Sequence, residues 1–221
     1  MERTPDMATG IFVTGTDTGV GKTRVACAML RAHVGIGLRA VGMKPIASGV
    51  PPGTSLNEDV IALAAAGNVD APIEFRNPYS FDPAIAPHLA AREANVRIDL
   101  GRIRSAYEEL CTRADRIVVE GAGGVLVPIN DDSGNSDMLD VARAIGAPLV
   151  LVVGLRLGCI NHALLSVQAI LARGLVLQGW VPSAIDPSFA RIEENVATLE
   201  RRIAAPRLPT IPWNPIPRNP T

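Results

Sequence analysis

The sequence predicts an α/β fold in which helices cover both faces of a parallel sheet, for three reasons. Short apolar runs rich in β-branched residues alternate with longer amphipathic or alanine-rich segments along the 221 residues. The runs are almost continuously apolar, which is typical of parallel strands buried on both faces. Hydrophobic residues make up 48% of the chain and charged residues 19%, enough for one sizeable core. We therefore expect residues 1–221 to form a single domain.

The alternation predicts the elements in chain order. The apolar, β-branched runs are expected to be strands, at Gly10–Gly15, Arg39–Lys44, Arg116–Glu120, Leu149–Gly154 and Val176–Val181. The other segments are expected to be helices, at Gly21–Val34, Asn57–Ala66, Pro83–Ala94, Asp99–Arg113, Asp137–Ile145, Cys159–Arg173 and Pro187–Arg201, with an irregular lead-in, NPYSFDP, before Pro83–Ala94. In such sheets ligands bind at the carboxyl ends of the strands, so functional residues should follow the strands.

The last sixteen residues, 206–221, form a tail that contains six prolines. Proline fixes φ and lacks the backbone donor, so this tail should be neither a helix nor a central strand. We expect an extended segment laid on the surface, or a frayed end.

Charge and composition exclude several classes of partner. A formal net charge of −1 gives no electrostatic footprint for nucleic acid or an anionic membrane. The longest apolar run, Ala147–Gly154, is far shorter than the ~20 residues of a membrane span, and the N-terminus lacks the apolar centre of a signal peptide. Cys27, Cys111 and Cys159 form no CxxC pair, which argues against disulfides and a zinc site. We expect a cytoplasmic protein whose partners are small molecules or a second copy of the chain.

The strongest chemical signal is IFVTGTDTGVGKT, residues 11–23, where an apolar strand runs into a glycine-rich turn and Gly-Lys-Thr opens a helix. Backbone N–H groups in such a loop converge on phosphate oxygens at the positive end of the helix dipole. Lys22 should reach the β- and γ-phosphates, and the Thr23 hydroxyl should bind Mg²⁺. The loop is a variant of the general pattern, because Gly15 lies one residue upstream and Thr16 takes its place. The fold should therefore be P-loop NTPase-like.

Two carboxylates could accompany this loop. Glu120 ends the apolar run RIVVE and precedes a glycine-rich turn, where a P-loop protein places its second magnesium contact. Asp59, in SLNEDVIAL, is by its chemistry alone better explained as an acidic residue that favours the first turn of a helix.

Two further segments could hold anionic groups. Lys44, in VGMKPIASG, could stabilise an anionic substrate or a transferring phosphoryl group, or be an ordinary surface lysine, and Ser48 could supply another donor. After the fourth strand, Gly158 and Cys159 start a helix whose exposed N–H groups suit a carboxylate, with Asn161 in its first turn. We expect Cys159 to be a packed residue and not a nucleophile.

Taken together, these segments resemble the dethiobiotin synthetases. The matching stretches, ordered as in that family, are VTGTDTGVGKT (13–23), MKPIASG (43–49), NPYSF (77–81), VVEGAGG (118–124) and LVVGLRLGCINHALL (151–165), with a looser match at GWV (179–181). Residues 11–23, which we call the phosphate loop, are by themselves shared with partition-type ATPases and cobyrinate amidases. The other stretches together are far more specific.

The resemblance implies an ATP- and Mg²⁺-dependent cyclo-ligase that acts on 7,8-diaminononanoate and CO₂. One amine takes up CO₂ to form a carbamate, and the carbamate oxygen attacks the γ-phosphate of ATP. The second amine then closes on the mixed anhydride, which releases phosphate and the cyclic urea. No covalent enzyme nucleophile is needed, so the protein supplies positioning and charge stabilisation.

The resemblance also implies roles for single residues. Lys22 and Lys44 would be catalytic, and magnesium would be held by Thr23, Asp59 and Glu120. ATP and its phosphates would contact Thr18, Gly19, Val20, Gly21, Lys22, Thr23 and Glu120. The diamine substrate would contact Lys44, Ser48, Gly158, Cys159 and Asn161. Similar proteins are homodimers, and the helix start at Gly158–Asn161 would bind the substrate carboxylate of the partner subunit's site.

The chain departs from that family at two positions, and two alternatives stay open. Many relatives carry an acidic residue where this chain has Gly19, and Ser183 stands where an Asn often binds adenine, so nucleotide preference is open. The main alternative is a partition-type nucleotide switch, which usually carries an early lysine where this chain has Thr16, Asp17 and Thr18. A cobyrinate amidase would need a glutamine-hydrolysing domain, for which 221 residues leave no obvious space.

Overall fold

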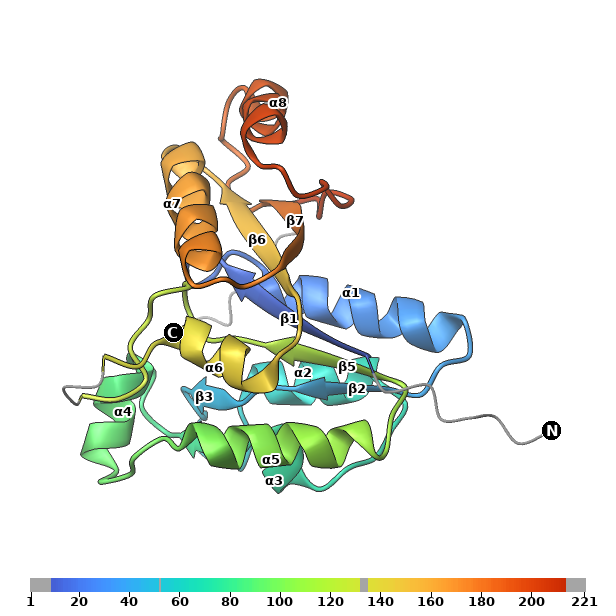
Figure 1. The fold of residues 1–221 in the computed structure, drawn as a ribbon, viewed down its shortest axis with the longest axis vertical. Helices are drawn as coiled ribbons and strands as arrows, with labels where there is room; N and C mark the ends of the chain where they lie inside the picture. Colours follow the sequence, from blue (N-terminus) through green and yellow to red (C-terminus); the bar gives the residue numbers. More distant parts are fainter. Residues whose placement is uncertain (1–8, 52, 132–134, 214–221) are drawn as a thin grey trace.

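The centre of the protein is a five-stranded parallel sheet. A computed structural model describes residues 9–51, 53–131 and 135–213. The strand order is β2-β5-β1-β6-β7, and every pairing between neighbours is parallel (Figure 1). The bounds are β1 (Thr9–Gly15), β2 (Ala40–Met43), β5 (Arg116–Glu120), β6 (Leu149–Leu155) and β7 (Leu177–Ala184). All five expected strands are present, although β7 continues three residues beyond the expected Val181.

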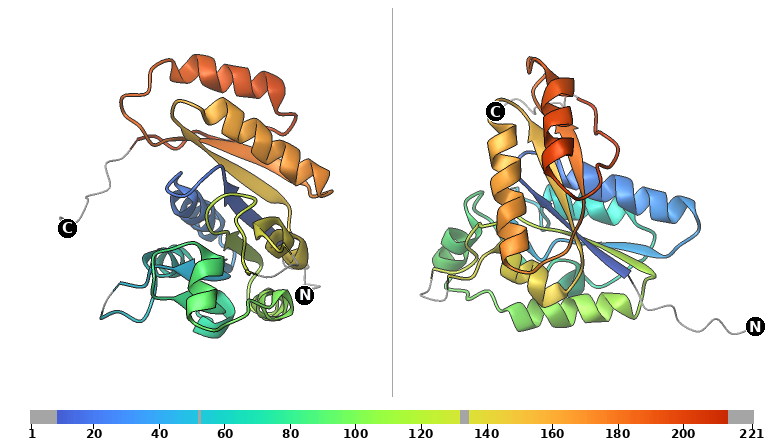
Figure 2. Two further views of the ribbon diagram at one scale, coloured as in Figure 1. Left: turned by 90° about the vertical axis from the view of Figure 1, so that its left-hand side faces the viewer. Right: turned by 45° about the horizontal axis from the view of Figure 1, so that its top comes forward.

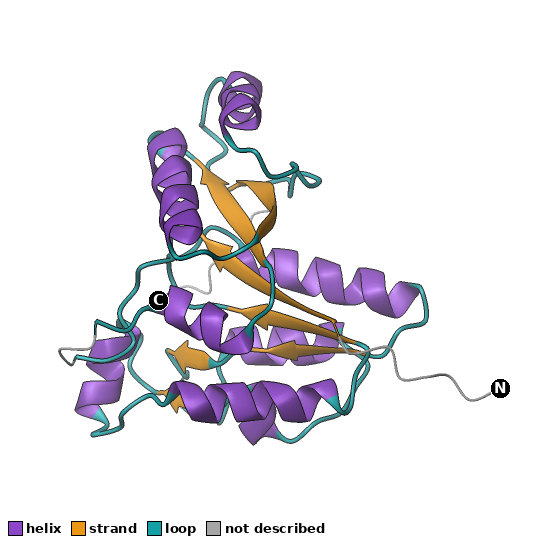
Figure 3. Cartoon of the chain, viewed as in Figure 1, coloured by secondary structure: helices purple, strands orange, loops and turns teal. Residues whose placement is uncertain are grey.

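Helices cover both faces of this sheet (Figure 3). Their bounds are α1 (Lys22–Gly35), α2 (Glu58–Ala66), α3 (Ile73–Arg76), α4 (Pro87–Glu93), α5 (Leu100–Cys111), α6 (Met138–Ile145), α7 (Cys159–Ala172) and α8 (Ile192–Arg202). The C-terminal helices α7 and α8 lie next to each other over β6 and β7 (Figure 2). The predicted α/β fold with helices on both faces is confirmed.

Alternation along the strands explains the two layers. In β5, Ile117 and Val119 belong to the buried cluster that includes α5, α6, α7 and α8, whereas Val118 belongs to the cluster with α1 and α2. Successive side chains of a strand point to opposite faces, so a strand apolar at every position feeds both cores. The continuous apolar runs of the sequence are therefore the direct cause of this layering.

The sequence prediction was wrong in four places, one of which is the start of α4, at Pro87 and not at the expected Pro83. The segment NPYSFDP, expected to be irregular, contains β4 (Tyr79–Phe81), which pairs in parallel with β3 (Ile46–Ser48) to form a separate two-stranded sheet. Strands of three residues are too short to show periodicity, as is the unexpected α3. Helix α8 begins at Ile192 and not at Pro187, because Asp186 accepts hydrogen bonds from the backbone and hydroxyl of Ser188 and holds a turn there.

The described part of the tail, up to Trp213, runs extended along the edge of β7. Leu208 and Ile211 donate their backbone N–H groups to the carbonyls of Trp180 and Pro182, at 2.8 and 2.9 Å. Each donor is followed directly by a proline, Pro209 and Pro212, at positions where no backbone N–H is needed for the pairing. The rest of the tail, 214–221, lies outside the described residues. No helix among the described residues is long and apolar enough to cross a membrane.

Candidate functional site

The phosphate loop connects β1 to α1 at the carboxyl edge of the sheet. Gly19 and Gly21 adopt left-handed φ values of 72° and 92°, which side chains rarely tolerate. A Cβ on Gly21 would lie 2.8 Å from Oγ of Ser183, so the loop also passes close to β7. Helix α1 has no side-chain cap at its N-terminus, which leaves its first N–H groups for an anion.

Lys22, the lysine of this loop, is buried, and its ammonium group folds back onto the loop. Its Nζ atom donates to the carbonyl oxygen of Asp17 at 2.8 Å. Burial and, next, repulsion from Lys44 lower the pKa of Lys22 to about 8. No carboxylate among the described residues forms an ion pair with Lys22, which suits its ammonium group to an incoming phosphate.

Four predicted site residues meet beside the loop, although they come from four different elements. Lys44 follows β2, Thr23 lies in α1, Asp59 in α2, and Glu120 ends β5. Nζ of Lys44 donates to Glu120 at 2.7 Å and to Asp59 at 2.8 Å. Oγ1 of Thr23 lies within hydrogen-bond distance of the same two carboxylates, 2.7 Å from Asp59 and 2.9 Å from Glu120, which share its one proton. We call these four residues the carboxylate cluster.

Burial and the neighbouring charges shift the pKa values of the charged groups in the carboxylate cluster. Burial alone would lower the pKa of Lys44, but the two carboxylates outweigh it and raise that pKa. Burial alone would raise the pKa of Asp59, but the charge of Lys44 and the hydrogen bonds from Lys44 and Thr23 lower it. Burial raises the pKa of Glu120, which is 1% exposed. Lys44 therefore stays cationic while it holds the two acids together.

The oxygens of the cluster fit a magnesium ion. Oε2 of Glu120 is buried and has no hydrogen-bond partner in the described part of the chain, so it can accept a further ligand. Mg²⁺ prefers oxygen ligands and is usually held by one or two carboxylates together with substrate phosphates. Among the described residues no group of three or more acidic, histidine or cysteine side chains could hold a metal, so a cation here would need the hydroxyl of Thr23 and an outside ligand.

Two asparagines that sequence reasoning gave no functional role fix the surroundings of the cluster. Asn57 caps α2 through the N–H of Asp59, and its amide donates to the carbonyls of Ser48 and Gly49. Asn77 donates to the carbonyl of Lys44 at 2.6 Å. Asn57 could have been found as an N-cap, whereas nothing local to Asn77 indicates its long-range partner.

Ser48 and Thr18, predicted to line the diamine and phosphate region, lie at different depths. Oγ of Ser48 is buried without a partner at the end of β3. Thr18 is exposed at the tip of the loop, and its Oγ1 lies 3.6 Å from the position of a Cβ built on Gly123. The loop tip therefore lies against the glycine-rich turn that follows β5.

The start of α7 offers fewer free N–H groups than the sequence suggested. Gly158 is the N-cap, with φ 93° and no side-chain cap. The backbone N–H of Cys159 is already bonded to the carbonyl of Arg156 at 3.0 Å, and its side chain is buried. The N–H groups of Ile160 and Asn161 precede the first intrahelical donor and remain for an anion.

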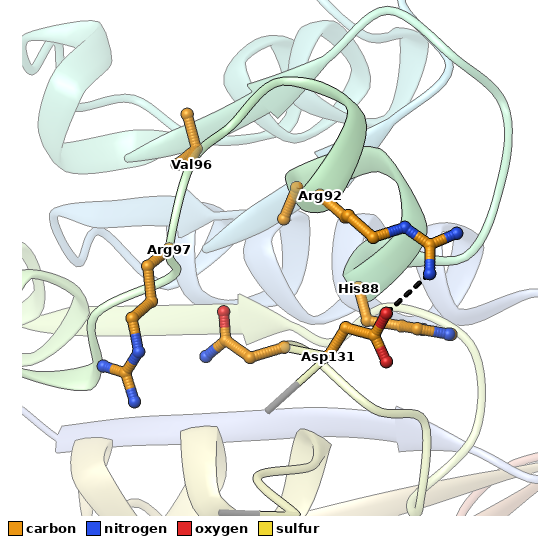
Figure 4. A pocket seen from close by; sticks show the side chains of 7 residues that line it. His88, Arg92, Val96, Arg97 and Asp131 are labelled. Atoms are coloured by element: carbon orange, nitrogen blue, oxygen red, sulfur yellow. Dashed lines mark hydrogen bonds and ion pairs between the residues drawn. The ribbon is translucent and has the colours of Figure 1, made fainter. Parts of the chain in front are cut away.

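A separate hollow lies between α4 and the loop that follows β5 (Figure 4). It has a volume of about 220 Å³ and is lined in part by His88, Arg97 and Asn130. Arg92 and Asp131, also in its wall, form an ion pair at 2.6 Å. None of the predicted site residues lines this hollow.

The chain is similar to known proteins over most of its length. A family model described as an AAA domain matches residues 9–221. The chain is 50% identical over 208 residues to the ATP-dependent dethiobiotin synthetase BioD of Nitrosospira multiformis, which covers 94% of this chain and 90% of that protein. It is also 50% identical over 203 residues to the protein of the same name from Aromatoleum aromaticum, covering 91% and 89%.

Similar solved structures share the fold at low identity. The MinD cell division protein of Aquifex aeolicus has a TM-score of 0.55 and 16% identity, covering 94% of this chain and 84% of that one. A ParA family ATPase from Chlorobium tepidum has a TM-score of 0.54 and 14% identity, covering 94% and 85%. This likeness concerns the architecture alone.

Proposed function

The chain belongs to the family of ATP-dependent dethiobiotin synthetases, and we propose that it forms the ureido ring of dethiobiotin from 7,8-diaminononanoate, CO₂ and ATP. The observation that carries the proposal is the 50% identity over 208 residues, because the fold is shared with proteins of other names. The partition-type switch therefore becomes the second candidate, supported by architecture alone. Residues 1–221 would act as one catalytic domain in the cytoplasm.

The reaction needs a nucleophile that the substrate itself supplies. One amine takes up CO₂ as a carbamate, whose oxygen attacks the γ-phosphate of ATP and releases ADP. The second amine attacks the resulting mixed anhydride, closes the five-membered urea and releases phosphate. The protein therefore has to hold the two reactants in line and stabilise negative charge on the transferring phosphoryl group.

In this proposal the phosphate loop holds ATP. Backbone N–H groups of Thr18 to Thr23 would surround the phosphates, with Lys22 moving from the Asp17 carbonyl to a phosphate oxygen. The unpartnered start of α1 and the positive φ of Gly19 and Gly21 support this arrangement.

Thr23, Asp59 and Glu120 would hold Mg²⁺, and the unsatisfied Oε2 of Glu120 supports this assignment. The bound ion would neutralise charge that develops on the β- and γ-phosphates. Lys44 shares both carboxylates in the free protein, so it would turn from them toward the carbamate and the phosphoryl group when a cation takes its place.

The diamine would lie between Ser48 and the loop tip, in a homodimer. Gly158, Cys159 and Asn161 of one subunit would bind the carboxylate of a diamine held in the partner's site. Leu157, directly before this helix start, is 91% exposed, which supports a contact with a second subunit there.

The direct test is phosphate release from ATP, Mg²⁺ and bicarbonate, with and without 7,8-diaminononanoate. Release that depends on the diamine and yields dethiobiotin is the expected result. ATP binding with no diamine dependence would contradict the proposal and favour the nucleotide switch, which predicts ATP-dependent dimerisation without product.

A mixing experiment tests the shared site. Lys44→Ala would remove the catalytic lysine from a site, and Gly158→Arg would block the helix start that binds the substrate carboxylate. Each variant alone should therefore be inactive. A 1:1 mixture that exchanges subunits should regain about one quarter of the wild-type activity, because half of the dimers carry one intact site. A mixture that stays inactive although its subunits exchange would show that each subunit uses its own α7.

A further inference from the structure

Arg156, which no role above includes, reaches the tip of the phosphate loop. It is the first residue after β6, and its Nη2 donates to Oδ2 of Asp17 at 2.5 Å across 139 residues of sequence. Among the described residues, Arg156 is the sole cation in an ion pair with Asp17. The side chains are 42% and 47% exposed, so the pair lies at the rim of the site.

Strand β6 holds the start of the loop at three successive points. The N–H of Thr16 donates to the carbonyl of Val152 at 3.0 Å, and the N–H of Gly154 donates to the Thr16 hydroxyl at 3.3 Å. The third point is the pair of Arg156 with Asp17. Since the first two contacts both hold Thr16, the side chain of Arg156 is, within the described part of the chain, what ties Asp17 to the end of β6.

Asp17 accepts hydrogen bonds from two later residues of the loop. Its carboxylate accepts the N–H of Thr18 at 2.7 Å, and its carbonyl accepts the ammonium of Lys22 at 2.8 Å. The carboxylate is also a negative charge in a loop that would receive a polyphosphate, so without compensation it would repel the ligand. Arg156 supplies that compensation from outside the loop.

We propose that Arg156 is a positioning residue for ATP, which acts through Asp17 by neutralising its carboxylate and holding the tip of the phosphate loop. The inference rests on the proposed function, because it takes the loop to bind ATP. The guanidinium is suited to this task because it stays charged, and a charged donor strengthens a hydrogen bond to a carboxylate.

The test measures ATP binding with Mg²⁺ by calorimetry in the absence of the diamine, so it does not depend on turnover. Arg156→Gln should raise the Kd for ATP about tenfold. Arg156→Lys, which keeps the charge, should stay within about threefold of wild type. In steady state, Arg156→Gln should raise KM for ATP while kcat and KM for the diamine change less than about twofold.

A double-mutant cycle with Asp17→Asn tests whether Arg156 acts through Asp17. If it does, adding Arg156→Gln to Asp17→Asn should weaken binding by less than about twofold. An additive double variant would overturn the proposal, as would an unchanged Kd in Arg156→Gln or a Lys variant as weak as the Gln variant. A rise confined to KM for the diamine would also overturn it.

Arg104→Gln is the matched control, because Arg104 pairs with Glu108 at 2.8 Å on the exposed surface of α5. Its Kd for ATP should equal that of wild type. If the wild-type protein binds no ATP, the proposed function fails. If the wild-type protein binds ATP and the Arg156 variants bind it equally well, the role of Arg156 is contradicted and the proposed function is not.

Discussion

The ammonium of Lys44 lies 2.7 Å from Oε1 of Glu120, and both side chains are buried. Their residues are 76 positions apart in sequence, at the ends of the neighbouring strands β2 and β5. Asp59 completes the arrangement from α2. In the protein without ligands, the ammonium of Lys44 therefore contacts the two carboxylates that the proposed function assigns to Mg²⁺.

Lys44→Ala should abolish turnover while it leaves ATP binding largely intact, because Lys44 touches the carboxylates and not the phosphate loop. We expect kcat to fall about 10²–10³-fold, the usual effect of losing a group that stabilises transition-state charge. Phosphate release and calorimetric ATP binding measure the two effects separately. Unchanged turnover would remove Lys44 from the mechanism.

The same substitution should strengthen Mg²⁺ binding in the absence of nucleotide. The ammonium of Lys44 competes with a cation for Asp59 and Glu120, so its removal frees both carboxylates. Calorimetric titration with Mg²⁺ should show a lower Kd for Lys44→Ala than for wild type. A higher Kd would mean that Lys44 orients the carboxylates for the metal and does not compete with it.

Glu120→Gln should lower the free energy of unfolding by about 2 kcal/mol, because it removes a charged partner from the buried Lys44. Urea denaturation measures the loss. The double variant Lys44→Met with Glu120→Gln should recover more than half of it, since the buried cation, which has lost Glu120 and keeps Asp59, is then gone. A double variant as unstable as the sum of its singles would show that the two groups are not coupled.

Gly21→Ala should destabilise the protein more than Gly37→Ala, by about 1 kcal/mol. Both glycines have positive φ, 92° and 81°, so the backbone strain of an alanine is similar at the two positions. A Cβ on Gly21 meets Oγ of Ser183 at 2.8 Å, whereas one on Gly37 meets nothing within 4 Å. Adding Ser183→Ala to Gly21→Ala should close part of the difference in urea denaturation, and no recovery would exclude that contact as its cause.

His33 should make the protein less stable in mild acid. Burial and, next, the charge of Arg116 lower its pKa below the ordinary value of 6.5. The unfolded chain then takes up the proton first, so stability present above pH 6.5 is lost as the pH falls below it. Between pH 7.5 and 5.5, Tm should fall further in wild type than in His33→Gln. Equal losses of Tm in the two proteins would contradict the lowered pKa of His33.

Local signals predicted most of the fold. Five strands and most helices were found because a buried strand is apolar at every position and an amphipathic helix repeats over several turns. The misses were β3, β4 and α3, each of four residues or fewer, and the starts of α4 and α8. Such elements are held by long-range pairing, as between Ile46 and Tyr79, and carry no periodicity of their own.

The sequence by itself determined the phosphate loop, because the Gly-Lys-Thr at the end of an apolar strand needs only neighbouring residues to form an anion site. A motif also predicted Glu120 as a site residue, and the family resemblance added Lys44 and Asp59 to the same proposed site. The tertiary structure decided that these three side chains share hydrogen bonds and that Arg156 pairs with Asp17. Those contacts arise because the strand order β2-β5-β1-β6-β7 brings distant strand ends to one edge, and no local pattern encodes that order.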